Sequence, residues 1–435
     1  LHSQGDEDLA YKIDGINEPL VSNRKYFVNK SRVKILGLLH VNLPYQFSGA
    51  IRMEIWTEPL SKIDKELQVF TNKFPTETSK YSNAFVKHRC DAYQKKRKDF
   101  GVVIPNNTSV SWIVEDNGTL IFCASLLDIE LLNLRVAHLH FPTNKLLELL
   151  SQTQSNLSCI FFHHGYGSHS YVRRYFDYSF LDAKEKVKRL SYEFMHWSHR
   201  KTLLKELFFN KNFTHVFVSE NFMKNEVIPD VGCRPMASIV INNPVNTSLF
   251  SLMKKRLDAT IRLKILFVRP MLPKYGISKF IEFVSRVEEI SPDSCDITVV
   301  GEGPLYDEMM LNLGKFPNVH FDNRFLTPKE LKSYFDKHHI LYCPTQWDSQ
   351  GLLALEALAA GLFVYSTNST SVPEFLGDIP NCFLTKYEDV QGDVEHLVQR
   401  KFLNDFNKNA RLAHAAVKMK YGISNIATQE LGLTS

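Results

Sequence analysis

The sequence lacks the patterns that mark several large classes of protein. Its seven cysteines are scattered, odd in number and never spaced as Cys-x-x-Cys. This argues against a disulfide framework or a zinc site and favours reduced cysteines in a cytosolic protein. No uncharged run approaches the length of a membrane span. GxGxxG, Walker, HExxH and nucleophile-elbow motifs are missing. The only Asp-x-Asp, at Asp6 and Asp8, lies in a polar leader, so no metal ion or other cofactor is implied.

The bulk composition is that of a folded protein large enough for two domains. The chain has 435 residues, of which 44% are hydrophobic and 23% are charged. The net charge of +5 is mildly basic and fits an anionic small ligand or an anionic membrane surface as well as nucleic acid. Because the sequence begins with Leu1 rather than Met, we expect that a preceding segment has been removed.

Short apolar runs alternate with stretches of helical spacing along the chain. Runs such as Val33–Leu39, Leu67–Phe70, Val136–Phe141, Cys159–Phe162 and His215–Val218 have the pattern of strands buried in a parallel sheet. Strands that alternate with helices predict βαβ units. A second series follows, with strands predicted at 263–268, 296–300, 340–343 and 361–365, and helices at 278–290 and 351–360.

We therefore predict an α/β protein with two Rossmann-like α/β/α domains, whose parallel sheets face each other across a cleft. Ligands of such folds bind at the carboxyl ends of the strands. The predicted division is an N-terminal extension or linker at 1–31, an N-terminal domain at 32–250, a C-terminal domain at 251–395 and C-terminal helices at 396–435, which pack back toward the N-terminal domain.

The strongest chemical signal lies at residues 344–361. A strand is predicted to end at Pro344 and a helix to begin near Gly351, with Asp348 just before the helix and Glu356 inside it. A glycine at a helix start lets free amides bind phosphate. Carboxylates are suited to accepting hydrogen bonds from sugar hydroxyls. The pattern predicts phosphate at the helix amides, ribose at Glu356 and the transferred sugar at Asp348. For Glu356 alone, a solvated side chain on an amphipathic helix is the alternative.

This stretch resembles the signature of glycosyltransferase family 4, in which two glutamates flank a Gly-Phe-Gly-Leu-like loop. The second glutamate is Glu356, and Asp348 stands in place of the first. The resemblance covers roughly residues 130–395. It implies the GT-B fold, with an N-terminal acceptor domain and a C-terminal donor domain, a nucleotide-sugar donor (UDP-sugar favoured) and retention of anomeric configuration. The implied donor-binding residues of the loop are Ser349, Gln350, Gly351, Leu352 and Leu353.

A basic pair extends the resemblance. Arg269 and Lys274 follow a predicted strand and match two residues of the family that clamp the donor diphosphate. The leaving diphosphate gains negative charge, which fixed positive charge stabilises. Two departures are visible, because Val268 replaces the usual glycine and Tyr275 is inserted before Gly276.

Two further segments of the C-terminal half match the family. Gly301 and Gly303 correspond to a Gly-x-Gly-Pro turn that lies near the base and ribose. Glu374 corresponds to the glutamate of a Pro-Glu pair near the phosphates. Thr370 and Ser371 stand where the family has two glycines, which predicts a changed donor pocket.

The N-terminal half offers two weaker matches. His164 directly precedes Gly165 at a predicted strand end, as in the His-Gly of the family, and is expected near the donor sugar. A structural hydrogen bond is an equally good reading of this histidine. Gly49, in a loop expected after the first strand, matches the glycine loop that faces the diphosphate.

The segment 171–213 mixes basic residues with aromatic ones. It predicts either an ordinary surface helix or a helix that lies on an anionic membrane, as some relatives use to reach lipid-linked acceptors. No nucleic-acid partner is favoured. We expect a cytoplasmic protein, peripheral to the inner face of the membrane if this segment binds it.

Three functions stay open at this stage. The first is a metal-independent, hexosyltransferase-like enzyme of polysaccharide biosynthesis, whose acceptor is a hydroxyl of a glycan, a lipid-linked molecule or a protein. The second is a hydrolase or epimerase with the GT-B fold. The third is a sugar-nucleotide-binding protein without catalysis, which the departures at Asp348, Thr370 and Ser371 keep open.

Overall fold

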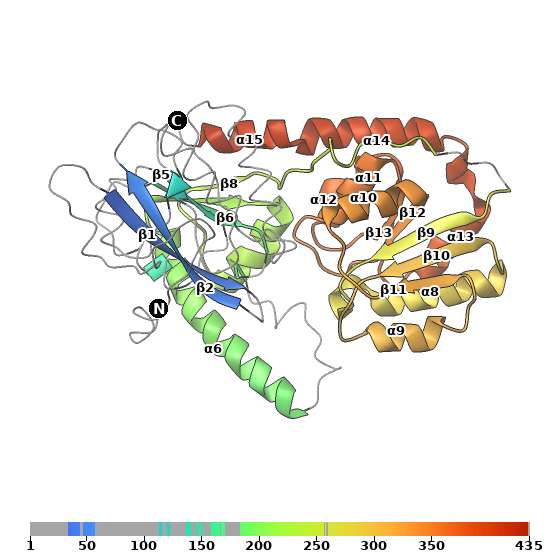
Figure 1. Ribbon diagram of the computed structural model, residues 1–435, viewed down its shortest axis with the longest axis horizontal. Coiled ribbons are helices and arrows are strands. Elements are labelled where there is room, and N and C mark those ends of the chain that lie inside the picture. The colour runs from blue at the N-terminus through green and yellow to red at the C-terminus, as the bar shows by residue number, and fades with distance from the viewer. Residues whose placement is uncertain are drawn as a thin grey trace, which may run out of the picture.

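The described residues of the computed structural model form two six-stranded sheets and a separate two-stranded ribbon (Figure 1). The predicted extension at 1–31 and the predicted strand at 67–70 lie outside the described residues. Those residues are 34–43, 47–56, 113–114, 120–121, 136–140, 144, 147–148, 151, 158–165, 167–169, 183–255, 257 and 260–433.

The sheet of the C-terminal half is parallel throughout, and it contains all four strands predicted there. The chain begins at a central strand, builds outward on one side and then returns to build the other side. The point where the direction reverses is where open α/β sheets bind ligands, and here it lies between β9 and β12. In spatial order the strands are β11 (Val319–Asp322), β10 (Cys295–Val300), β9 (Leu263–Val268), β12 (Ile340–Cys343), β13 (Phe363–Thr367) and β14 (Cys382–Thr385).

Helices cover both faces of this sheet, because alternate residues of each buried strand point to opposite faces. Ile265 and Phe267 of β9 pack on one side, where α8 (Ile277–Ile290), α9 (Tyr306–Leu313) and α13 (Val390–Gln399) lie. Leu266 and Val268 pack on the other side. That second face is covered by α10 (Pro328–Lys337), α11 (Leu352–Ala360) and α12 (Val372–Leu376) (Figure 1).

A buried ion pair joins α8 to α13. Lys279 Nζ lies 3.0 Å from Asp393 Oδ2, and the two side chains are only 1% and 2% exposed. Tyr342 donates a hydrogen bond of 2.7 Å and Thr385 one of 2.8 Å to the same carboxylate. The carboxylate therefore has its charge partner and two hydroxyl donors inside the core, where an unpaired charge is costly.

We expect Lys279→Met to lower the free energy of unfolding by about 3–5 kcal/mol, because it leaves the Asp393 carboxylate buried without its charge partner. Arg286→Met is the matched control on the same helix. It removes an exposed ion pair with Glu282 and should cost less than about 1 kcal/mol. Urea unfolding followed by circular dichroism measures both. Equal losses in the two variants would contradict the prediction.

The N-terminal sheet combines a parallel core with an antiparallel edge. The predicted strands at 136–141, 159–162 and 215–218 are confirmed within one or two residues. The long helix α6 (Ala183–Phe208) connects two parallel neighbours, and the turns η2 (Phe222–Val227) and α7 (Ile228–Val231) follow. In spatial order the strands are β4 (Leu120–Ile121), β3 (Ile113–Val114), β5 (Val136–His140), β6 (Ser158–His163), β7 (Phe213–Phe217) and β8 (Ser238–Val240).

The strand predicted first along the chain lies outside the parallel sheet that was expected to contain it. β1 (Lys34–Leu43) pairs antiparallel with β2 (Phe47–Trp56), outside both larger sheets. Gly49 lies within β2 opposite Val41, so the expectation that it sits in a loop facing the diphosphate is wrong. The sequence from residue 51 to 55 alternates apolar and charged residues, which is the period of a strand and outweighs the loop signals before it.

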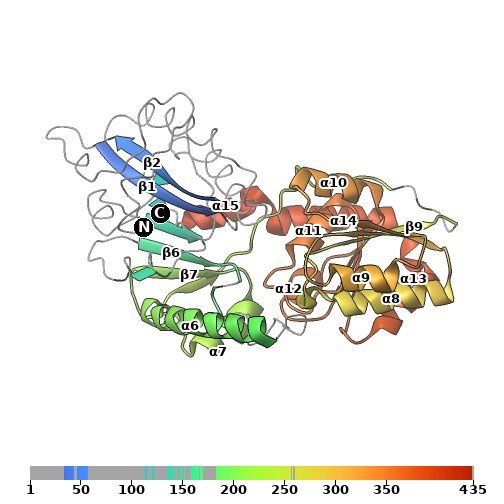
Figure 2. The same ribbon diagram turned by 60° about the horizontal axis from the view of Figure 1, so that its bottom comes forward.

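The C-terminal helices run along both domains (Figures 1 and 2). After the short turn η4 (Lys401–Leu403), α14 (Phe406–Tyr421) packs against α11 through Ala413 and Val417. The next helix, α15 (Ile423–Gly432), places Ile426 in a cluster with strands of the N-terminal sheet. The amide of Val245 donates a hydrogen bond of 2.8 Å to the carbonyl of Tyr421, so the connection between the domains is held where the two helices meet.

Candidate active site

The ends of β9 and β12 bring the basic and acidic candidates together. Arg269 follows β9, and its Nη2 donates hydrogen bonds to Cys343 Sγ at 2.8 Å and to Thr345 Oγ1 at 3.1 Å. The same nitrogen lies 3.7 Å from Asp348 Oδ2. The guanidinium is therefore fixed at the switch point of the sheet, with its charge beside the loop that leads into α11.

Arg269 combines a fixed charge with unused hydrogen-bonding capacity. Its side chain is only 10% exposed, and its Nε has no acceptor among the described residues. Burial opposes the charged form, but Cys343 and Asp348 outweigh it and raise the pKa of the guanidinium above its ordinary value. Such a group is suited to an anion that enters the site.

Lys274 lies in the short turn η3 (Pro273–Tyr275), which follows Arg269 along the chain. Its carbonyl accepts a hydrogen bond of 2.8 Å from the amide of Gln346, which ties η3 to the loop after β12. Lys274 Nζ lies 4.7 Å from the ring centroid of Tyr275, and the Arg269 guanidinium lies 5.0 Å from the same ring. Both cations therefore contact the ring of the inserted tyrosine. The structure brings the predicted basic pair to one place.

The start of α11 is open. Gly351 has the left-handed φ of +51°, and a Cβ added there would meet nothing within 4 Å. No side chain caps this helix end. The first amides of a helix without a cap are hydrogen-bond donors for an anion. Leu352 and Leu353, both predicted to touch the donor, are half-buried and pack against the core at this end.

Glu356 is a carboxyl group without a hydrogen-bond partner in the part of the chain that the structure describes. It is half-buried by accessible surface. It is nevertheless enclosed well enough that burial raises its pKa to about 8, which the charge of Arg269 only partly opposes. At neutral pH this carboxyl group is therefore mostly protonated in the ligand-free protein. Strongly shifted carboxyl groups in clefts are typical of functional sites.

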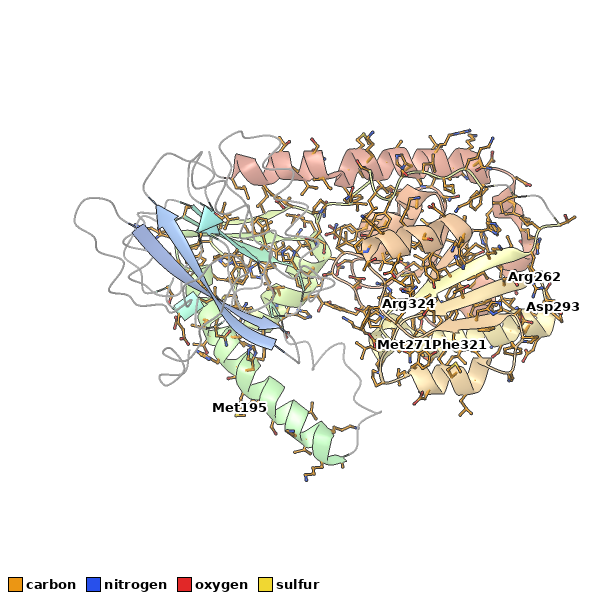
Figure 3. The ribbon with its side chains drawn as sticks, in the orientation of Figure 1. Met195, Arg262, Met271, Asp293, Phe321 and Arg324 are labelled. Carbon is orange, nitrogen blue, oxygen red and sulfur yellow. The ribbon has the colours of Figure 1, made fainter. Side chains whose placement is uncertain are left out.

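The glycine pair after β10 has a steric role. A Cβ on Gly301 would lie 2.0 Å from the carbonyl oxygen of Arg269, and one on Gly303 would lie 2.9 Å from the amide nitrogen of Met271. Only glycine lets this turn pack against the residues that follow β9. Figure 3 shows Met271, Phe321 and Arg324 at the end of the sheet that faces the N-terminal domain, and Arg262 and Asp293 at the opposite end.

His164 lies where the two domains meet. Its Nδ1 is 2.8 Å from Asn243 Oδ1, and its carbonyl accepts a hydrogen bond of 2.7 Å from Ser349 Oγ. The structure therefore brings the loop after β6 to the loop after β12. A structural hydrogen bond was one of the two expectations for this histidine, and such a bond is present; its role beside a donor sugar stays a prediction.

Three side chains predicted to bind the donor are engaged by the other domain. Ser349 donates to His164, as described. Gln350 Oε1 accepts from the amide of Asn243 at 2.6 Å, and its Nε2 donates to the carbonyl of Asn243 at 3.0 Å. Glu374 accepts hydrogen bonds of 2.9 Å from two backbone amides, those of residues 220 and 221. These side chains connect the domains in this structure, and any donor contact of theirs would have to come from the backbone or after a rearrangement.

Residues outside the predicted set also shape the site. Thr370 Oγ1 lies 3.2 Å from both the amide nitrogen and the carbonyl oxygen of Asp348. Its φ of +47° lies in the left-handed region, which favours glycine. Cys343 and Thr345 were missed as partners of Arg269. Their positions at the end of a strand beside β9 were the signal that could have found them.

No group of three His, Cys, Asp or Glu side chains within the described ranges could hold a metal ion. This observation leaves the predicted metal independence of the reaction untested, since donor phosphates can themselves hold a metal ion.

Comparison with known protein families finds a match in the C-terminal half of the chain. Residues 252–419 match the sequence profile of the family described as glycosyl transferases group 1. The matched range contains the whole parallel sheet from β9 to β14 and the loops that hold Arg269, Asp348 and Glu356. This part of the chain is similar to the glycosyl transferases of group 1, in agreement with the resemblance found in the sequence.

Solved structures share the architecture of both domains. Sucrose-phosphate synthase from Thermosynechococcus elongatus is 14% identical, with 80% of this chain and 92% of that chain covered and a TM-score of 0.56. The Anabaena protein HepE in complex with UDP-glucose is 12% identical, with 71% and 80% covered and a TM-score of 0.52. These likenesses establish the fold, which is the two-domain GT-B fold.

A curated relative matches only a short stretch. An uncharacterized 41.2 kDa protein from the cps region of Klebsiella pneumoniae is 39% identical over 67 residues. The match spans 15% of this chain and 19% of the length of that protein.

Proposed function

We propose that the protein is a retaining glycosyltransferase that moves a sugar from a UDP-sugar to a hydroxyl group of an acceptor. One observation carries the proposal. A fixed cation at Arg269, an open helix start at Gly351 and an unpartnered carboxyl group at Glu356 converge at the switch point of a group 1 glycosyltransferase domain. A nucleoside diphosphate sugar has a complementary set of groups, namely phosphates and hydroxyls.

Each part of the donor has a partner in this proposal. The diphosphate lies between Arg269, Lys274 and the first amides of α11. The ribose hydroxyls lie at Glu356, whose carboxyl group otherwise has no partner among the described side chains. The transferred sugar lies at Asp348, next to His164 from the other domain. The Anabaena structure of the same fold contains UDP-glucose, which supports uridine as the base.

The proposed reaction keeps the configuration of the anomeric carbon. The acceptor hydroxyl attacks the face from which the diphosphate leaves. The bond between the anomeric carbon and the phosphate oxygen breaks, a new bond to the acceptor oxygen forms, and the proton passes to the departing phosphate. The protein contributes positioning and charge stabilisation through Arg269 and the helix amides rather than a covalent nucleophile.

Nucleotide binding is tested by thermal shift with UDP, GDP, ADP, CMP and TDP. At about a hundred times its dissociation constant, a ligand that binds only the folded state adds roughly 2.7 kcal/mol, which raises Tm measurably. We expect UDP to give the largest shift. Gly351→Asp should abolish it, because a carboxylate then stands where the diphosphate binds. Gly351→Asn is the matched control, of equal size but without charge, and should retain most of the shift.

Equal responses of the aspartate and asparagine variants would contradict an anion site at Gly351. If no nucleotide shifts Tm in the unmodified protein, the donor site itself is refuted. Turnover of UDP-sugar without any acceptor would favour the hydrolase or epimerase with the same fold. Binding without any turnover would favour the non-catalytic protein.

The acceptor is proposed to be a glycan or a lipid-linked glycan of polysaccharide biosynthesis. The short match to a protein of a cps region supports this class. Exposed apolar side chains on α6 support an acceptor that is reached at a membrane surface. Val187, Leu190 and Phe194 are 63%, 39% and 71% exposed and recur at helical spacing, with Lys184 and Lys188 exposed nearby. Met195, beside them, points away from the protein in Figure 3.

We expect α6 to bind vesicles that contain anionic phospholipid and to bind neutral vesicles much less. Leu190→Asp with Phe194→Asp should lower vesicle co-sedimentation at least about tenfold, because it places charge in the apolar stripe. Leu311→Asp is the control, since Leu311 is 83% exposed on α9 in the other domain. Equal binding by all three proteins would contradict the proposal. No helix among the described residues is long and apolar enough to cross a membrane.

A further inference from the structure

Two aromatic rings from different segments contact the ammonium group of Lys274. Lys274 Nζ lies 4.7 Å from the ring centroid of Tyr275 and 5.1 Å from that of Trp347. Both distances are within the roughly 6 Å over which a ring face attracts a cation, and the attraction is strongest for tryptophan. Trp347 is only 5% exposed, so its ring meets the charge where little water can screen it. The charge of Lys274 is therefore tied to the loop after β12.

The backbone brings these two segments into close contact. The amide of Gln346 donates a hydrogen bond of 2.8 Å to the carbonyl of Lys274. Gly276, which ends η3 with a φ of +74°, approaches the same loop so closely that an added Cβ would lie 2.0 Å from the carbonyl oxygen of Pro344. Because only glycine allows this approach, the turn that carries Lys274 has a fixed position against the loop that carries Trp347.

Trp347 also packs against residues of the N-terminal domain. Its ring centroid lies 5.0 Å from that of His169 and 6.4 Å from that of Phe222. A Cβ added to Gly165 would lie 3.7 Å from Trp347 Cη2, which is ordinary van der Waals contact. These neighbours restrict the orientation of the indole ring. The orientation matters, because a cation is attracted to the face of a ring.

We infer that Trp347 is a positioning residue that places the ammonium group of Lys274 for the donor diphosphate, with Tyr275 in support. Lysine carries a point charge on a flexible stem, and it loses rotamer entropy when a phosphate immobilises it. A ring face restricts that freedom and, unlike a carboxylate, leaves the positive charge unneutralised. The role at the diphosphate rests on the proposed function, whereas the contact between ring and cation does not.

Tryptophan fluorescence without nucleotide tests the contact itself. A positive charge close to an indole ring changes its emission, so Lys274→Met should shift the emission of the unmodified protein. The same replacement should leave the emission of the Trp347→Phe variant unchanged, because three of the four tryptophans remain there and Trp347 does not. Equal shifts in the two proteins would show that the signal comes from another tryptophan, and the inference would be overturned.

Calorimetry of UDP binding in a double-mutant cycle tests the positioning role. Trp347→Leu keeps an apolar side chain without a ring and should weaken UDP binding about five- to tenfold, in line with the entropy of immobilising one flexible side chain. When Lys274 is already methionine, the same replacement should weaken binding less than about twofold, because the group on which Trp347 acts is gone. Equal losses with and without Lys274 would mean that Trp347 acts through packing alone, which would overturn the inference.

Conservative and control variants complete the cycle. Trp347→Phe keeps a ring face and should lose less UDP affinity than Trp347→Leu. Phe316→Leu is the matched control, since Lys315 Nζ lies 5.0 Å from the Phe316 ring centroid, outside the candidate site. It removes the same kind of contact and should leave UDP binding unchanged. If Trp347→Leu does not fold, Tyr275→Leu takes its place in the cycle, because Tyr275 is only half-buried. A loss in Tyr275→Leu that does not depend on Lys274 would then refute the inference.

The two proposals can fail separately. If UDP does not bind the unmodified protein, but Lys274→Met shifts the emission only where Trp347 is present, the proposed function fails and the placement of the Lys274 charge by Trp347 is supported. If UDP binds the unmodified protein and Trp347→Leu equally well, the positioning role is refuted and the donor site stands.

Discussion

Replacement of Arg269 by methionine is expected to lower turnover of the UDP-sugar at least about a hundredfold. A loss of this size is typical when a fixed hydrogen-bonding group that stabilises charge in the transition state is removed. Negative charge on the leaving diphosphate grows as the bond to the sugar breaks. Arg269 is held by Cys343 and Thr345, so its charge is in place before the reaction begins. The loss should therefore fall mainly on kcat, with a smaller effect on UDP binding.

Two further variants distinguish the loss of the Arg269 charge from a general loss of structure. Arg269→Lys keeps the charge but loses the planar group that contacts two partners, so we expect intermediate activity. Arg262→Met is the matched control. Arg262 pairs with Asp293 and Asp296 on the surface at the opposite end of the sheet (Figure 3), and its loss should not change turnover. Near-normal kcat in Arg269→Met would remove this residue from the reacting site.

Replacement of Glu356 by glutamine is expected to make the protein more stable, since functional groups are often destabilising. It should also lower activity, because an ionised carboxylate that could accept hydrogen bonds from the ribose hydroxyls is lost. The folded protein holds the Glu356 proton up to a pKa of about 8, against 4.5 for the ordinary carboxyl group. Above pH 4.5 the unfolded chain releases this proton and the folded chain does not. The free energy of unfolding therefore falls as the pH rises from 4.5 to 8.

Glutamine has no proton to release, so its advantage should grow over the same pH interval. We expect roughly 1–3 kcal/mol at pH 8, which is less than the full shift implies because the side chain is half-buried. At pH 5 the two proteins should be nearly equal in stability. Urea unfolding at both pH values gives the difference. A difference that does not depend on pH would mean that Glu356 is ionised in the resting protein.

Much of the C-terminal domain could be predicted because its strands are short, mostly apolar and followed by clear turns. β9 and β12 were predicted with their observed bounds for this reason. β11 and β14 were not predicted, since Val319–Asp322 and Cys382–Thr385 mix polar and apolar residues at the margins of the sheet. β1 was predicted at Val33–Leu39, and its end and β2 were missed because Asn42, Ser48 and Gly49 favour a loop when read locally, whereas pairing between the two strands outweighs that preference.

The candidate site also has a part that could be predicted from the sequence and a part that could not. Arg269, Lys274, Asp348, Gly351 and Glu356 lie within two local segments, and the resemblance of both segments to one family predicted that they act together. The partners of Ser349, Gln350 and Glu374 lie more than a hundred residues away along the chain, and no local pattern could predict them.

By itself the sequence determined the local structures on which the proposed donor site rests. A strand, a turn of fixed length and a helix start are local structures, and they carry the charges and amides that suit a nucleoside diphosphate. Only the tertiary structure decided how the two domains meet and which of the predicted side chains are already bound there. The reason is physical. Contacts between domains depend on which backbone groups are left without partners after each domain has folded, and that is settled by packing in three dimensions.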